Sequence, residues 1–235
     1  MPFTRPRHWL RWLIGGIVVL AALAVAGPFL YIHFFNGSTP AALTLSPSGS
    51  SAPSATSASS SAMAGSWTVG SGSVVGYRVN EVLLGQNTTA VGRSTSVTGH
   101  LTIAGSTATA ASFSVTMDTI RSDKSQRDDR FKGPIMDVAK YPTGTFALTS
   151  PVDLAPLPAA GTVRTYTAHG KLTLHGTTRA VTVTLTAQRT ASGIKVAGQI
   201  PVLFSDYNIQ NPSFAGFVTT QDHGLLEFLL VFTRS

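Results

Sequence analysis

From residue 67 to the end, apolar and polar side chains alternate along the chain with a period of two. The alternation is clearest in residues 97–103, 111–118, 181–188 and 194–202, where Val, Leu, Ile, Ala and Phe take turns with Thr and Ser. This period is typical of antiparallel strands that bury one face and expose the other. Because Gly, Ser and Asn clusters separate the runs, the pattern predicts an all-β domain, either a sandwich or a barrel.

No stretch of this domain predicts a long helix. Residues 123–138 are expected to hold one or two short helical turns that a Gly-Pro pair ends, with Phe131 covering one end of the sheet. The final run, 225–232, is apolar on both faces except for Glu227, which predicts a strand buried on both sides. The second face of this strand is covered either by the rest of the domain, by a second subunit of a homodimer, by the membrane or by a lid.

The N-terminal part of the chain has a different character. Residues 13–35 form an uncharged and mostly apolar run of 23 residues, long enough as a helix to cross a hydrocarbon core of about 30 Å. Arg5, Arg7 and Arg11 precede this run, so the positive-inside rule predicts a single-pass helix in the cell membrane, with a cytoplasmic N-terminus and the remainder outside. The alternative is a signal peptide cleaved near Ala26, and both interpretations export the domain.

Residues 36–66 consist almost entirely of Ser, Ala, Pro, Thr and Gly and carry no charge. Such a composition cannot bury enough apolar surface to offset the entropy of ordering, so this segment is predicted to be a flexible linker. The chain thus divides into a basic cytoplasmic segment (1–12), a transmembrane helix (13–35), the linker (36–66) and a folded domain (67–235). The domain is large enough to bury a substantial core.

Composition excludes several kinds of chemistry. The chain has no cysteine, which excludes disulfides, thiolate metal sites, a Cys nucleophile and a lipoprotein anchor on Cys. The net charge is +7, but no Lys/Arg cluster with interleaved aromatic residues indicates nucleic-acid binding. His169 and His175 would lie about 20 Å apart on one extended strand, too far to share a metal ion. No nucleophile elbow or phosphate-binding Gly loop appears, so we assign no catalytic residue, metal site or cofactor.

Five segments carry a family resemblance, in this order: Met117-Asp118-Thr119-Ile120, Arg127-Asp128, Tyr141-Pro142-Thr143, Gly170 to Thr178, and Phe204 to Ile209. Together they resemble the pattern of the YceI-like family across essentially all of the domain. The resemblance implies an antiparallel, eight-stranded, lipocalin-like barrel whose elongated apolar cavity holds a polyisoprenoid chain, such as that of an isoprenoid quinone. It also implies export, in agreement with the N-terminal run.

Three segments depart from the family pattern. Residues 77–82 contain no His, where the family often has one after its first long strand, and an Arg-Asp-x-His pattern is replaced by Arg127-Asp128-Asp129-Arg130. A Phe-rich step before Tyr-Pro is replaced by residues 133–138. These departures fall where a barrel mouth is expected, so the identity of the lipid stays open. The charged cluster is either a solvated turn or, through Arg127 and Asp128, the site that orients a lipid headgroup.

The candidate ligand-binding residues are the large apolar side chains expected to point inward or to cover the mouth. They are Phe113, Val115, Met117, Phe131, Phe146, Leu148, Val183, Leu185, Phe204 and Phe217. Phe217 belongs to the aromatic loop 205–217, which is either a lid over the mouth or a packed surface loop. Alternation alone favours an ordinary filled core for the inward set, whereas the resemblance favours a hollow one.

These observations favour a membrane-tethered, extracytoplasmic protein that binds a long-chain isoprenoid lipid and carries or sequesters it. The expected partners are this lipid and the cytoplasmic membrane, reached through residues 13–35, with a homodimer left open and nucleic acid excluded. Two alternatives remain: an enzyme that processes envelope lipids, and a structural or adhesion module whose barrel is filled.

Overall fold

The computed structural model describes part of the chain, namely residues 16–17, 20, 39–46, 63–83, 85–213 and 218–235. Among these residues, no helix is both long and apolar enough to cross a membrane. The predicted span, 13–35, falls outside the described residues except at three positions, and Phe217 falls outside them as well. The fold described below is therefore that of the domain and of one piece of the linker.

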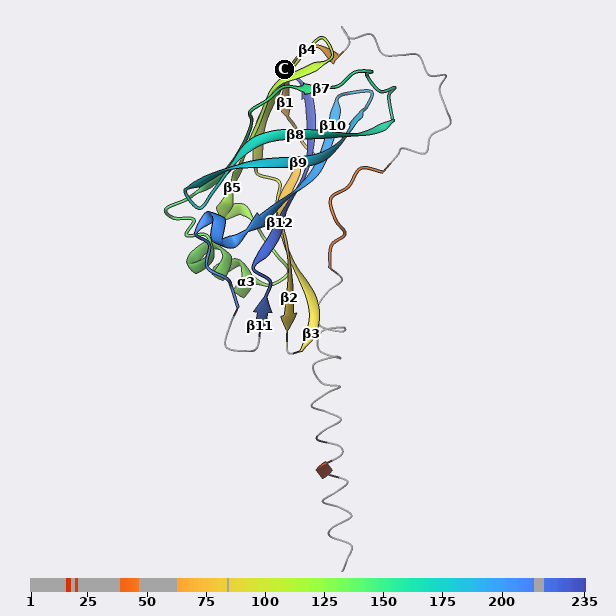
Figure 1. Cartoon of the computed structure of the whole chain (residues 1–235). Coiled ribbons are helices and arrows are strands. Elements are labelled where there is room, and N and C mark those ends of the chain that lie inside the picture. The colour runs from red at the N-terminus through yellow and green to blue at the C-terminus, as the bar shows by residue number, and fades with distance from the viewer. Residues whose placement is uncertain (1–15, 18–19, 21–38, 47–62, 84, 214–217) are drawn as a thin grey trace, which may run out of the picture.

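Twelve antiparallel strands in the described residues form one sheet (Figure 1). The first begins at Gly65, two residues before the predicted start of the domain. The strands are β1 (Gly65–Val69), β2 (Val74–Leu83), β3 (Gln86–Ser94), β4 (Val97–Ala104), β5 (Thr107–Thr116), β6 (Thr143–Leu148), β7 (Val152–Asp153), β8 (Val163–Leu174), β9 (Thr177–Arg189), β10 (Ile194–Leu203), β11 (Val218–Thr220) and β12 (His223–Arg234).

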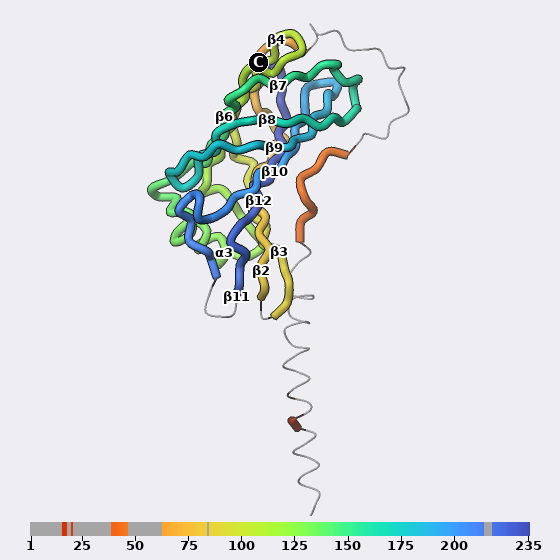
Figure 2. Tube along the Cα trace, in the orientation of Figure 1, coloured from red at the N-terminus to blue at the C-terminus, as the bar shows by residue number. Residues whose placement is uncertain are grey.

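Eight of these strands close into a barrel in the order β1, β4, β5, β6, β8, β9, β10 and β12, and pairing of β1 with β12 completes the ring. The predicted all-β, eight-stranded antiparallel barrel is confirmed. Strand β2 continues the line of β1 along β12 and pairs with β3, and the tips of β2 and β3 lie beside β11 at one end (Figures 1 and 2). We call this the mouth end, and the opposite end, with the β4–β5 turn, the far end.

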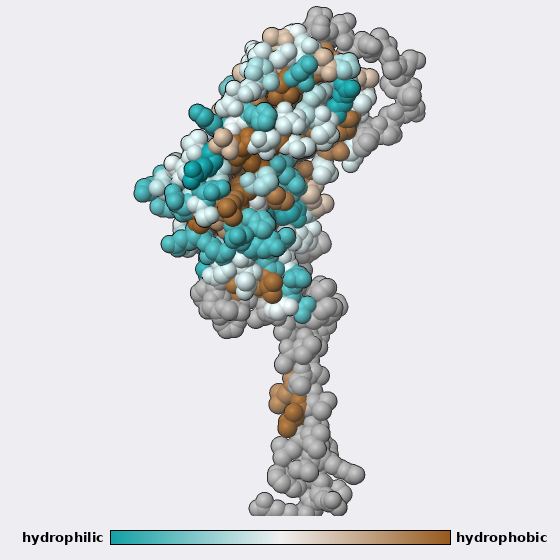
Figure 3. Space-filling model, viewed as in Figure 1, coloured by the Kyte–Doolittle hydropathy of each residue, from teal (hydrophilic) through white to brown (hydrophobic). Residues whose placement is uncertain are grey.

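Buried and exposed residues alternate in β4 without a break, which is the period-two pattern that the sequence predicts. The outer surface in Figure 3 is accordingly mostly hydrophilic or neutral, with smaller apolar areas between. The core lies inside the ring, where the apolar faces of all the strands meet.

The connection between β5 and β6 contains short helical turns at the mouth end: η1 (Met117–Thr119), α3 (Ser125–Arg130) and a single π-helical turn, η2 (Phe131–Ile135). A further 3-10 turn, η3 (Phe204–Tyr207), follows β10. The turns predicted for residues 123–138 are therefore present. The buried carboxylate of Asp128 accepts hydrogen bonds of 2.7 Å from both the backbone N–H and the hydroxyl of Ser122, which ties α3 to the chain that precedes it.

The outer face of β12 is only partly covered, so the prediction of a strand buried on both sides is wrong for most of this face. Its apolar residues on this face, Leu225, Leu229 and Val231, are half-buried rather than fully buried, but Glu227 is only 1% exposed. The Glu227 carboxylate accepts hydrogen bonds from Arg78 (2.7 Å), Arg93 (3.4 Å) and the side chain of Gln199 (3.1 Å).

The same two arginines hold a piece of the predicted linker. Arg78 donates a hydrogen bond of 2.7 Å to the carbonyl oxygen of Pro40, and Arg93 donates one to the carbonyl oxygen of Ala41. Leu43 and Leu45 are half-buried while their neighbours are exposed. Residues 39–46, which we call the strap, therefore lie against the outside of the barrel (orange in Figures 1 and 2).

The quoted segment Gly170 to Thr178 folds into the β8–β9 hairpin. Leu174 pairs with Thr177, which leaves a two-residue loop whose residues have positive φ angles, 48° at His175 and 73° at Gly176. This is the conformation of a type I′ turn, in which glycine carries no steric cost. The ring of Tyr141 packs over the turn, with its centroid 4.6 Å from that of His175.

We expect Gly176→Ala to destabilise the domain by about 2–3 kcal/mol, because a Cβ strains the turn and meets the Tyr141 ring. That Cβ would lie 2.5 Å from the nearest ring carbon. The control is Gly105→Ala, at a position with φ of 60° where a Cβ has no neighbour within 4 Å, for which we expect only the backbone cost of about 1 kcal/mol. Urea unfolding measures the stability of both variants, and equal losses of stability would contradict the role given to Tyr141.

Candidate functional site

The mouth-end half of the barrel is hollow. A cavity of about 400 Å³, the first cavity, lies between the barrel wall and the helical turns that follow β5. Its wall is largely apolar and comes from β2, β5, β10, β12 and the turns. Among the residues that line it are Val75, Tyr77, Val79, Glu81, Leu83, Phe113, Val115, Met117, Phe131, Val202 and Phe204. A volume of this size lies within the range of small-molecule sites.

Charged and polar side chains line the first cavity where it meets solvent. Lys124, Gln126, Arg127 and Arg130 of the α3 region lie there together with Glu81 of β2. The buried Asp128 carboxylate ties this segment to Ser122, and the long polar side chains of the segment line the opening. The cavity therefore has an apolar interior and a polar mouth.

Arg127 is the best-defined charge at the mouth. Its guanidinium lies 3.0 Å from the carboxylate of Glu81 and also pairs with Asp123. Burial lowers the pKa of Arg127, but the two carboxylates outweigh this effect and raise the pKa above its ordinary value. Arg127 is thus a permanent cation with fixed orientation, able to donate hydrogen bonds to an oxygen at the mouth.

Tyr77 and Phe131 form the aromatic part of the wall beneath this mouth. Their rings stack with centroids 5.1 Å apart and an interplanar angle of 17°. Burial raises the pKa of the Tyr77 phenol to about 12, so the hydroxyl stays neutral at any physiological pH. The pair connects β2 to the helical segment and gives the cavity a rigid flat side.

A second, smaller cavity of about 110 Å³ occupies the far-end half of the barrel. Apolar side chains line almost all of it, among them Met63, Leu101, Leu154, Val183 and Phe232. It is too small for more than a few carbon atoms, since an engineered cavity of about 150 Å³ holds one benzene molecule.

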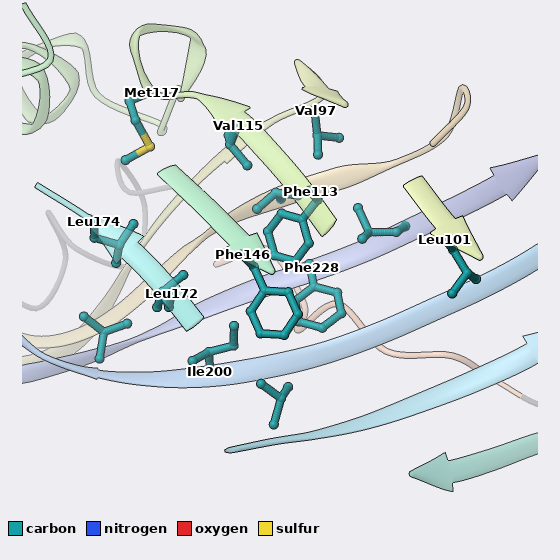
Figure 4. Packing of buried hydrophobic residues seen from close by; sticks show 14 of the residues in the cluster. Val97, Leu101, Phe113, Val115, Met117, Phe146, Leu172, Leu174, Ile200 and Phe228 are labelled. Atoms are coloured by element: carbon teal, nitrogen blue, oxygen red, sulfur yellow. The ribbon is translucent and has the colours of Figure 1, made fainter. Parts of the chain in front are cut away.

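Three phenylalanine rings stand between the two cavities. Phe113 lies 5.4 Å from Phe146 and 5.5 Å from Phe228, measured between ring centroids, and Figure 4 shows the three rings clustered across the interior. Two glycines make room for them, because a Cβ at Gly170 or Gly198 would lie 2.4 Å or 2.6 Å from the ring of Phe146 or Phe228. We call Phe113, Phe146 and Phe228 the partition.

The structure places the sequence-predicted residues on both sides of this partition. Those in the wall of the first cavity are Val115, Met117, Phe131, Phe204 and Arg127, and those in the wall of the second are Phe146, Leu148, Val183 and Leu185, whereas Phe113 belongs to both. Asp128 belongs to neither wall, because its carboxylate turns back to Ser122. Phe217 lies outside the described residues. Their contact with a ligand stays a prediction.

The contribution of β2 to the cavity wall was not predicted from the sequence. Val75, Tyr77, Val79, Glu81 and Leu83 are alternate residues of this strand, and all five line the first cavity. The period-two rule used for the other strands would have selected them. Glu81 is a polar residue in an otherwise apolar set, which marks the position where that face reaches the mouth.

His169 and His175 contact other side chains of the domain. His169 shares a hydrogen bond of 3.1 Å with the hydroxyl of Thr182, and His175 packs on Tyr141. In the part of the chain that the structure describes, no group of three or more His, Cys, Asp or Glu residues could hold a metal ion. The geometry of the site is that of a container for an apolar molecule.

A closed eight-stranded antiparallel barrel with an apolar cavity open at one end defines the lipocalin-like class of proteins, whose interior can hold one small ligand. The chain belongs to the YceI-like domain family, whose model matches residues 67–232. A comparison with curated protein sequences returns no match.

Two solved structures show the same fold. A polyisoprenoid-binding domain from Saccharophagus degradans, implicated in plant cell wall breakdown, is 17% identical, with a TM-score of 0.61, and the match covers 73% of this chain and 99% of that one. BcnA of Burkholderia cenocepacia is 22% identical, with a TM-score of 0.51, covering 66% of this chain and 95% of that one. At these identities the likeness extends to the fold.

Proposed function

We propose that this protein binds a long-chain isoprenoid lipid in its barrel and carries or sequesters it outside the cytoplasmic membrane, to which residues 13–35 tether it. The observation that carries the proposal is the first cavity, an apolar chamber with a charged mouth. Family membership and the polyisoprenoid-binding description of the Saccharophagus degradans domain support the same class of ligand. The role is one of binding, without a catalytic step.

The volume of the first cavity sets how much of the lipid it takes. At about 150 Å³ for a six-carbon ring, a cavity of about 400 Å³ accommodates about 15 carbon atoms, or three isoprene units. Burying 15 carbons contributes about 12 kcal/mol at about 0.8 kcal/mol per CH₂, which is comparable to the free-energy cost of association. The remainder of a longer chain extends beyond the mouth.

The polar end of the lipid belongs at the mouth in this proposal. The Arg127 guanidinium, fixed by Glu81, is placed to donate hydrogen bonds to a quinone carbonyl or a phosphate oxygen. The apolar tail then points inward past Tyr77 and Phe131. This orientation follows from desolvation, because a charged headgroup inside the chamber would lose its water without replacement.

The direct test is to purify the full chain from membranes and to analyse its organic extract by mass spectrometry. We expect a prenyl lipid that co-purifies with the protein and that added prenyl quinone displaces saturably. A lipid-free protein with no saturable binding of prenyl quinones or polyprenols would contradict the proposal.

The tether has its own test. We expect the protein to stay with the membrane through an alkaline wash, and release of the protein would contradict the proposed tether.

Substitution Phe228→Leu is expected to open the partition and to shift the chain-length preference. Affinity for chains of eight or more isoprene units should rise relative to a three-unit chain, because the second cavity becomes reachable. The measurement is competition between the two lengths against a fluorescent prenyl probe. The matched control is Phe232→Leu on the same strand, which removes the same atoms from the second cavity but leaves the partition intact. An equal shift in both variants would contradict the partition.

A further inference from the structure

The strap has a direction along the barrel. Arg78, which holds the carbonyl of Pro40, pairs in the sheet with Leu225, whereas Arg93, which holds that of Ala41, pairs with Gly76. Gly76 lies two residues farther from the mouth end than Arg78. The strap therefore runs away from the mouth end as its numbering increases, and its N-terminal side points toward the mouth.

The chain before the strap is short. Only five residue steps separate Pro40 from Phe35, the last residue of the predicted span, and they reach at most about 18 Å. From Arg78 to the tip of β2 at Leu83 is about 17 Å along the strand, which is within this reach. From Leu225 to the far end of β12 at Arg234 is about 30 Å, or about 23 Å along the axis of a barrel with strands tilted by about 40°. A membrane span that ends at Phe35 therefore reaches the level of the mouth end and not that of the far end.

The surface of the mouth end fits a lipid headgroup layer. In the described part of the domain, the large apolar side chains with the highest exposure are Val82 (37%) and Leu203 (40%), and both lie at this end, on β2 and at the close of β10. Residues 121–132, which border the mouth, hold five basic and three acidic residues, and two further carboxylates, Glu81 and Asp118, pair with Arg127 and Lys132, so charges of both signs are balanced there. Figure 3 shows apolar and hydrophilic atoms side by side at the lower end of the barrel.

We propose that the strap fixes the barrel with its mouth end against the outer surface of the membrane, so that the first cavity opens onto the leaflet. This rests on the proposed tether through residues 13–35. In this proposal only the residues between the membrane span and the strap set the height of the barrel above the membrane. An isoprenoid chain enters the cavity from the leaflet without crossing water, and the ion pairs of Glu227 hold the two arginines that keep the strap in place.

The absence of cysteine from the chain allows the orientation to be tested with single labels. Full-length Val82→Cys and Ala104→Cys variants, at the mouth end and at the exposed end of β4, are labelled with a fluorophore and placed in nanodiscs with quencher on the lipid headgroups. We expect strong quenching of the label at residue 82 and little at residue 104. Equal quenching of the two labels, or stronger quenching at 104, would overturn the inference while leaving lipid binding and the tether intact.

A second variant tests the short link itself. Insertion of 12 Gly/Ser residues between Asn36 and Gly37 leaves the strap and the domain unchanged but extends the reach by up to about 43 Å. We expect quenching at residue 82 to fall toward that at residue 104. Unchanged quenching would overturn the role of the strap. Protein that leaves the nanodisc in an alkaline wash would refute the tether, and this inference with it.

Discussion

Replacing Val115 with phenylalanine is expected to weaken lipid binding by about a hundredfold to a thousandfold. Val115 is 3% exposed and lines the first cavity, so the added ring takes the space of about one isoprene unit. Loss of that unit removes about 4 kcal/mol of burial. The measurement is the dissociation constant for a prenyl quinone, with far-UV circular dichroism to establish that the barrel is retained.

The matched control for this substitution is Thr184→Phe. Thr184 lies on the exposed face of β9, so the same ring is added outside the barrel and binding should be unchanged. Val202→Phe repeats the test from β10, on another part of the first-cavity wall. Wild-type affinity in both folded cavity variants would show that the lipid occupies some other place.

The largest effect on stability is expected for Glu227→Gln. The carboxylate is 1% exposed and is shared by Arg78 and Arg93, so the neutral amide leaves two partly buried guanidinium groups without a counter-charge. Loss of one member of a buried ion pair typically costs about 3–5 kcal/mol, and water reaching the two arginines favours the lower value. We expect about 3 kcal/mol, or a fall in Tm of about 6–12 °C, measured by thermal unfolding.

Asp222→Asn supplies the comparison. Asp222 also pairs with a neighbouring side chain, that of His223, at 2.7 Å, but both side chains are exposed. Exposed pairs contribute little, so we expect a change of no more than about 0.5 kcal/mol. Similar losses of stability in the two variants would contradict the idea that burial of Glu227 makes its ion pairs important for stability. Weaker protection of the strap from proteolysis in Glu227→Gln alone would link this ion cluster to the strap.

The strands were predictable because burial in a barrel repeats every second residue. The alternation in residues 97–103 appears as buried and exposed positions in β4, whereas in β9 it holds only as far as Thr184, and Gln188 is buried although it is polar. The helical turns after β5 were also predictable, since a Gly-Pro pair and a charged turn interrupt the pattern there. For the candidate site, the inward residues of β5 and the position of Arg127 at the mouth could be predicted, whereas its role toward a headgroup stays a prediction and the residues of β2 were overlooked.

Other features depend on contacts between distant parts of the chain. Glu227 looks in sequence like the one polar interruption of an apolar strand, yet Arg78 and Arg93, more than a hundred residues away, make it one of the most buried side chains. The linker composition predicts flexibility throughout, and the contacts of Pro40 and Ala41 arise only once β2 and β3 are formed. No local pattern encodes either contact.

The amino-acid sequence by itself determined the all-β class, the apolar N-terminal run and the family pattern, because each of these depends on the order of residues along the chain. Tertiary structure alone decided that the interior is hollow near α3 and interrupted by Phe113, Phe146 and Phe228. Periodicity tells which side chains point inward but not how far they reach toward one another. How far the side chains reach depends on closure of the barrel and on glycines such as Gly170 and Gly198, which leave space for the phenylalanine rings.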